Sequence, residues 1–144
     1  NLNFSIMKTI IKFSLSLLMA VTIMNCNNRD SEDLVQSVDR VKIDSVKISQ
    51  DTMDVFTVQT IKTFSNFTTK CEGFYGYDYI YTDQLARSVS SFKFKTGVAC
   101  GEEVARASQI NFQPQQTGNY VFKFWTGKNA AGESTWIEKT IVVQ

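Results

Sequence analysis

Four tyrosines alternate along one short stretch of the sequence, FYGYDYIY at residues 74–81. Because side chains of an extended strand point alternately to its two faces, these tyrosines are predicted to share one face. They are Tyr75, Tyr77, Tyr79 and Tyr81. Two interpretations stay open: the rings belong to the core with their hydroxyls bonded at its edge, or they form an exposed platform that stacks on a sugar or a partner's strand.

Two other side chains are candidates for the same binding surface. Arg87 follows the tyrosine stretch closely, so its guanidinium can pair with Asp83 or Asp78, or can line the tyrosine face. Trp125 lies in a late aromatic run, and we expect at least one of Trp125 and Trp136 to belong to the core. Aromatic rings and an arginine indicate recognition of a glycan or a protein partner.

The sequence contains no histidine. This excludes the commonest general base, every Ser-His or Cys-His nucleophile, and zinc sites built on imidazole. Glu102 and Glu103 are adjacent, hence on opposite faces of a strand, and do not form the carboxylate pair of a glycoside hydrolase. We therefore predict a protein that is not an enzyme, with no catalytic residue, metal or cofactor. Without residues 1–25, which carry two lysines and no acid, the chain has 13 basic and 14 acidic side chains, so nothing indicates a nucleic-acid partner.

Residues 1–25 have the layout of an export signal. Lys8 and Lys12 precede or open an apolar run of 12 residues from Phe13 to Met24, and no acid occurs before residue 30. The run is much shorter than the roughly 20 residues of a membrane-spanning helix. The sequence predicts a signal peptide that starts at Met7, with an upstream extension before it.

Cys26 directly follows this run, where bacterial lipoproteins are cleaved and diacylated. The segment resembles that broad class: Ile23 matches its aliphatic position, whereas Met24 and Asn25 are larger than its pattern prefers. The resemblance implies a lipid anchor on Cys26 and a place in the cell envelope, at the outer membrane on its periplasmic or surface face. Each buried methylene contributes about 0.8 kcal/mol to such anchoring. The alternative is a free or intermolecularly paired thiol.

The polar residues 26–39 are predicted to be a flexible tether, and residues 40–144 a single β domain. Short alternating runs rich in valine, isoleucine, threonine and aromatics favour an immunoglobulin-like antiparallel β-sandwich of about seven strands. The alternation slips near Asp44 and Ser45, which predicts a break or bulge there. The stretch GEEVARAS is expected to be a loop. The predicted strands are 41–49, 53–63, 73–82, 86–96, 105–113, 119–126 and 134–143.

Two local features support this fold. QTGNYVFKF places a tyrosine, Tyr120, at the start of a late strand, as in the tyrosine corner of such sandwiches. Once Cys26 is lipidated, Cys71 and Cys100 are left to form a disulfide in an exported chain. A loop of this length would stabilise the fold by roughly 3 to 4 kcal/mol. Two reduced core thiols are the alternative.

The domain also resembles small uncharacterised lipoproteins of the Bacteroidetes, of flavobacterial type. The resemblance rests on Cys71, FYGYDYIY, Arg87, Cys100 and YVFKFWTGK, and it covers about residues 55–144. The tract NNRDSED after Cys26 is similar to the acidic export signal of surface lipoproteins in that group. The tripeptides that begin at Asp44 and Asp51 are similar to its O-glycosylation sites, which would modify Ser45 and Thr52.

These features predict a lipid-anchored envelope protein whose non-catalytic β-sandwich binds or supports another envelope or surface component. The alternative is a carbohydrate-binding module that uses an exposed tyrosine face. The predicted partners are a membrane, through the N-terminal lipid, and a protein or a glycan, with no nucleic acid.

Overall fold

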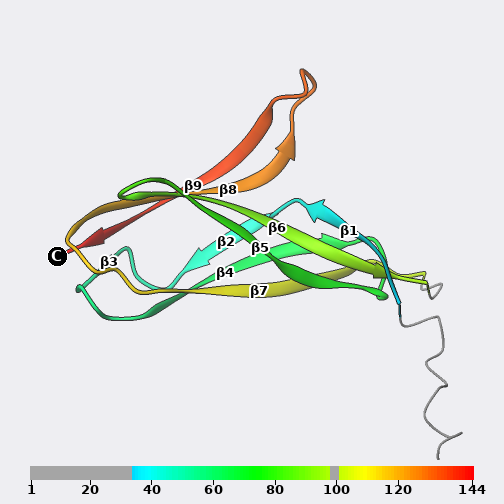
Figure 1. The fold of residues 1–144 in the computed structure, drawn as a ribbon, viewed down its shortest axis with the longest axis horizontal. Coiled ribbons are helices and arrows are strands. Elements are labelled where there is room, and N and C mark those ends of the chain that lie inside the picture. Colours follow the sequence, from blue (N-terminus) through cyan, green and yellow to red (C-terminus); the bar gives the residue numbers. More distant parts are fainter. Residues whose placement is uncertain (1–33, 98–100) are drawn as a thin grey trace, which may run out of the picture. The chain divides into compact units, whose positions relative to one another are not determined.

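The computed structural model describes residues 34–97 and 101–144, and within these ranges the chain forms nine strands and no helix (Figure 1). The predicted all-β sandwich is confirmed, with nine strands in place of about seven. The strands are β1 (Val35–Val41), β2 (Ser45–Ile48), β3 (Thr52–Met53), β4 (Gln59–Phe67), β5 (Glu72–Asp83), β6 (Ala86–Thr96), β7 (Val104–Phe112), β8 (Gly118–Lys128) and β9 (Ser134–Val143).

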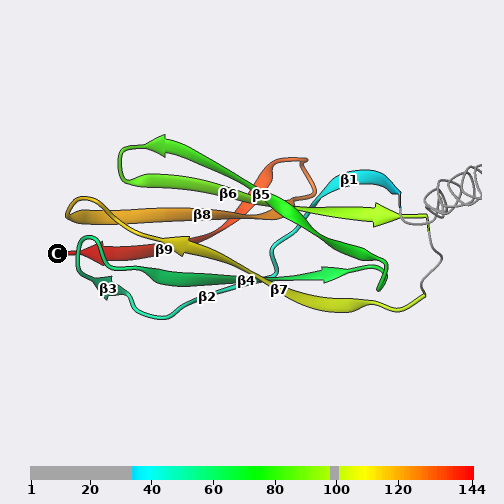
Figure 2. The ribbon, with the colours of Figure 1, turned by 60° about the horizontal axis from the view of Figure 1, so that its bottom comes forward.

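The strands form two sheets, which can be followed in Figures 1 and 2 by the strand labels. In the six-stranded sheet β6 is central: β5 pairs with one edge, while β8 and then β1 pair with the other, and β9 and β3 continue beyond β8. The three-stranded sheet has the order β2-β4-β7. The β6–β8 and β3–β9 pairs are parallel, so the larger sheet is mixed rather than antiparallel as predicted. Among the described strands β5 pairs only with β6, and β7 pairs only with β4, so both are edge strands.

The predicted strand 41–49 consists of two strands. The chain leaves the larger sheet after Val41 and enters the smaller one at Ser45, where the alternation slips in the sequence. β1 begins at Val35, so residues 35–39, which the sequence assigns to the tether, belong to the sheet. The reason is non-local: β8 pairs with β6 only as far as Val89, and the remaining edge of β6 is free to pair with β1. The predicted strand 53–63 is likewise divided between β3 and β4.

The core lies between the layers and follows the alternation of the strands. In β8 the side chains of Tyr120, Phe122 and Phe124 are buried, and the ring of Phe122 lies 5.0 Å from that of Phe112 on β7. Burial of each such apolar side chain stabilises the fold by about 1.5 to 3 kcal/mol. The β8–β9 hairpin, which the sequence predicts, extends past this core at its tip (Figure 1).

A tyrosine corner lies at the start of β8, where the β5–β6 turn also contacts this strand through Leu85. The Tyr120 hydroxyl donates a hydrogen bond to the Gln116 carbonyl at 3.2 Å, as in sandwiches of the immunoglobulin type. Gly118 has a φ of 142°, and a Cβ there would lie 2.6 Å from a methyl carbon of Leu85. The Val121 N–H donates to the Leu85 carbonyl at 2.8 Å. The turn is therefore held against β8, which brings Arg87 close to Tyr120.

Cys71 lies in the turn between β4 and β5 and is disulfide-bonded, which excludes a reduced thiol at this position. Cys100 and Cys26 lie outside the described residues, so the pairing of Cys71 with Cys100 and the lipidation of Cys26 stay predictions. In the described ranges we find no helix of the length and apolar character that crossing a membrane requires.

Candidate functional site: a groove between two edge strands

A groove of about 810 Å³ opens where the edge of the larger sheet faces the edge of the smaller one. β5 and β6 supply one wall, β7 supplies the other, and the connection from β7 to β8 closes one end. Most of the side chains that line it are aromatic or carry a primary amide. The lining residues are Tyr77, Tyr79, Tyr81, Gln84, Arg87, Gln109, Ile110, Asn111, Phe112, Gln113, Pro114, Gln115, Gln116 and Tyr120.

Three of the four predicted tyrosines line this groove, and Tyr75 does not. The register of β5 against β6 shifts between Phe74 and Gly76, so Tyr75 is the extra residue of a β-bulge. The ring of Phe74, on the other side of the bulge, lies 4.7 Å from the ring of Tyr77. Phe74 therefore shares a face with Tyr77, where simple alternation predicts Tyr75. The prediction of one shared face therefore fails at Tyr75, whose side chain is 62% exposed.

Of the three tyrosines that line the groove, two belong partly to the core and one is exposed, so each interpretation of the sequence holds for part of the set. Tyr77 and Tyr79 are half-buried and pack against the core, and Tyr81 is 70% exposed. The Tyr77 hydroxyl lies 2.6 Å from the Thr63 hydroxyl, which is itself buried. Burial raises the pKa of Tyr77 above its usual value, although the hydrogen bond with Thr63 lowers it in part. Burial raises the pKa of Tyr79 in the same way, and there the charge of Arg87 lowers it in part. Both hydroxyls therefore stay protonated at neutral pH and can donate hydrogen bonds.

Arg87 lies at the base of the groove and is only 7% exposed. Its Nη1 donates to the main-chain carbonyls of Asp83, Gln84 and Ala86 at 2.9 to 3.1 Å. The guanidinium carbon lies 4.0 Å from the Tyr81 ring centre and 5.6 Å from that of Tyr120. Of the two alternatives for Arg87, the structure shows the side chain lining the tyrosine face; its contact with Asp83 is to the main chain.

The amide side chains come from a segment that sequence reasoning did not select. Four glutamines, at 109, 113, 115 and 116, and Asn111 lie within eight residues in QINFQPQQ. The Gln84 amide donates to the Gln116 side-chain oxygen at 3.1 Å, which joins the β5–β6 turn to the β7–β8 connection across one end of the groove. The density of amides in this run was a signal in the sequence, but its position opposite the tyrosines required the fold.

Trp125 lies elsewhere, at the base of the projecting β8–β9 hairpin. The Arg40 guanidinium carbon lies 5.0 Å from its ring, and its indole N–H donates to Ser134 at 3.2 Å. Neither tryptophan is buried, since Trp125 is half-exposed and Trp136 is 39% exposed, so the expected core tryptophan is absent. Figure 1 shows the tip of this hairpin projecting away from the strands of the smaller sheet.

The two predicted glycosylation residues lie on exposed positions. Ser45 is the first residue of β2 and Thr52 the first of β3, and both side chains are exposed. Both are on the outside of the strands that carry them and neither lines the groove.

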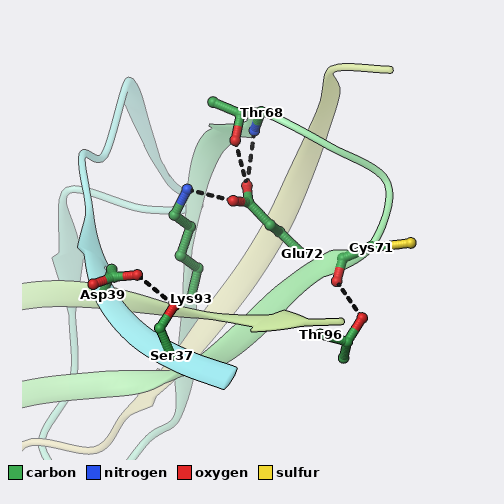
Figure 3. A network of polar contacts seen from close by, with 7 residues as sticks. All are labelled: Ser37, Asp39, Thr68, Cys71, Glu72, Lys93 and Thr96. Carbon is green, nitrogen blue, oxygen red and sulfur yellow. Dashed lines mark hydrogen bonds and ion pairs between the residues drawn. The ribbon is translucent and has the colours of Figure 1, made fainter. Parts of the chain in front are cut away.

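A second polar cluster lies at the other end of β5, around a buried carboxylate (Figure 3). Glu72 accepts hydrogen bonds from the Thr68 N–H and hydroxyl, both at 2.9 Å, and forms an ion pair with Lys93 at 2.8 Å. Burial raises the pKa of Glu72, and these bonds together outweigh burial, so the net pKa lies below the usual value of 4.5. The cluster ties the end of β4 to β5 and β6.

The groove has the chemistry of a recognition site. Among the described residues that line it there is no carboxylate and no thiol. The described part of the chain also contains no group of three His, Cys, Asp or Glu side chains suited to a metal ion. Rings, amides and one guanidinium can bind and orient a polar ligand.

The sequence matches no protein-family model and no curated protein, and its fold matches no solved structure. The resemblance to Bacteroidetes lipoproteins therefore stays a prediction from the sequence.

Proposed function

We propose that this chain is a lipid-anchored envelope protein whose β-sandwich is a non-catalytic binding domain. In this proposal the groove between β5 and β7 holds a saccharide that belongs to another envelope or surface component. The observation that carries the proposal is the composition of the groove, in which three tyrosines face a run of primary amides.

Each part of the groove suits a sugar. Tyrosine rings pack against the apolar faces of sugar rings, and amides both donate to and accept from hydroxyl groups. The volume of about 810 Å³ is within the range of small-ligand sites. Since Tyr77 and Tyr79 are packed against the core, this part of the surface is formed before the ligand arrives.

Two tyrosines of the same strand provide a matched test of the groove. Tyr81 and Tyr75 are similarly exposed, at 70% and 62%, but only Tyr81 lines the groove. We expect the wild-type domain to bind in a glycan screen, Tyr81→Ala to weaken that binding at least tenfold, and Tyr75→Ala to leave it unchanged. Absence of binding by the wild-type domain, or equal losses in the two variants, would refute the saccharide site.

The lipid anchor has its own test. We expect the mature N-terminal peptide to begin at Cys26 and to carry acyl mass, and Cys26→Ser to release the protein from the membrane fraction. A soluble wild-type protein whose mature chain begins elsewhere would refute the anchor without affecting the groove.

A further inference from the structure

Arg87 is a buried cation without an anionic partner in the described part of the chain. Its side chain is 7% exposed, and no carboxylate forms an ion pair with it. Its Nε is buried and has no hydrogen-bond partner. Buried charges in proteins are normally paired, because removal of an ion from water costs several kcal/mol.

The surroundings of Arg87 hold the guanidinium in place without neutralising it. Nη1 is bonded to main-chain carbonyls, which carry only partial charge, and the rings of Tyr81 and Tyr120 flank the guanidinium carbon. The nearby Asp83 carboxylate instead accepts from the Gln84 N–H at 2.7 Å. The groove therefore carries the positive charge of Arg87 with no acid among its described lining residues.

We propose that the ligand of this groove is an acidic saccharide, whose carboxylate is recognised by Arg87. This inference rests on the proposed saccharide function and specifies the class of sugar. A carboxylate supplies the negative charge that Arg87 lacks, and hydrogen bonds between two charged groups are stronger than those between neutral ones. The amides of the β7–β8 connection then bind the hydroxyls of the same sugar, and Tyr81 packs on its ring.

The wild-type domain alone can test the proposal. A panel of uronic-acid and sialic-acid oligosaccharides is prepared in two forms, the free carboxylate and its methyl ester, which differ in charge but hardly in shape. We expect the carboxylate forms to bind about ten- to a hundredfold more tightly than their esters, as a hydrogen bond to a charged group implies. This preference should decrease as the salt concentration rises.

Variants assign the preference to Arg87. Arg87→Gln should bind carboxylate and ester equally, and Arg87→Lys should keep part of the preference, since it retains the charge but not the fork of donors. Lys123→Gln is the control, because it removes an exposed cation that does not line the groove and should leave the preference intact. If Arg87→Gln does not fold, the affinities of the wild-type domain for the carboxylate and for the methyl ester still show whether the ligand is acidic.

The outcomes separate the two proposals. Equal binding of acid and ester by the wild-type domain would overturn the acidic ligand and leave the saccharide groove standing. Binding of neither form, together with a negative screen of neutral glycans, would overturn both. A preference that survives in folded Arg87→Gln would also overturn the role of Arg87.

Discussion

Two buried charged side chains lie in the larger sheet, Glu72 near one end of β5 and Arg87 near the start of β6, and their surroundings differ. Both oxygens of Glu72 are bonded, one to Lys93 and the other to Thr68, and the carboxylate is 4% exposed. Arg87 is 7% exposed and has carbonyls and rings around it, but no anion among the described residues. Completed bonding is typical of a structural contact, whereas an unmatched charge beside a groove is typical of a binding site.

The location of each group agrees with this difference. Glu72 forms its ion pair with Lys93 and its bonds with Thr68 where β4 turns into β5, next to the disulfide-bonded Cys71 (Figure 3). Arg87 lies where the edges of the two sheets separate and the groove opens. A polar pair can replace apolar packing inside the sandwich, but a lone cation is useful only where another molecule can reach it.

The largest expected effect is on the Glu72 pair. Lys93→Met leaves a buried carboxylate without its cation, so the free energy of unfolding at pH 7 should fall by about 3 to 5 kcal/mol in urea denaturation. The control is Lys123→Met, which breaks the ion pair between Lys123 and Glu138. Both of these side chains are about half exposed. That loss should be below about 1 kcal/mol. Similar losses in the two variants would show that Glu72 does not depend on Lys93.

A smaller effect is expected at Arg87. Arg87→Met removes a cation without leaving an acid unpaired. Stability is lost because three main-chain carbonyls no longer have the Arg87 Nη1 group as their hydrogen-bond donor. We expect the free energy of unfolding to fall by about 1 to 3 kcal/mol, measured in the same way. A loss as large as that of Lys93→Met would mean that Arg87 is as necessary to the fold as the Glu72 pair, and the contrast would fail.

The smallest effect is the response of Glu72 to acid. Its pKa is lower in the folded chain than the ordinary value of 4.5, so its contribution to stability is complete above about pH 4.5 and is lost as the pH falls through the folded-state pKa. One proton accounts for at most about 1.4 kcal/mol per pH unit. In urea titrations from pH 7 to pH 3, the advantage of the wild-type domain over Glu72→Gln should shrink as the pH falls. A constant difference would contradict the lowered pKa.

Local pattern was sufficient to predict much of the fold. The bounds predicted for β6 and β9 agree with those observed, and Tyr120, whose position in the sequence indicates a tyrosine corner, forms a hydrogen bond of that kind with the Gln116 carbonyl. These features depend on alternation and turn residues, which act over a few positions. The division of the sheet among β1, β6 and β8 depends on which edge remains unpaired, and short-range alternation carries no information about that.

The candidate site shows the same limit. Alternation correctly groups Tyr77, Tyr79 and Tyr81, but the bulge at Tyr75 follows from register with β6, which no local pattern reports. Likewise, the amide run after residue 108 is visible in the sequence, but its role follows from β7 being an edge strand opposite β5.

The sequence by itself therefore determined the class of the fold, its strand periods and the residue types available for binding. The tertiary structure decided which tyrosines face a groove, that Arg87 is buried without an acid, and that Glu72 has a partner in Lys93. The physical reason is that periodicity is a property of neighbouring residues. Burial and charge pairing depend instead on contacts between strands far apart in the chain.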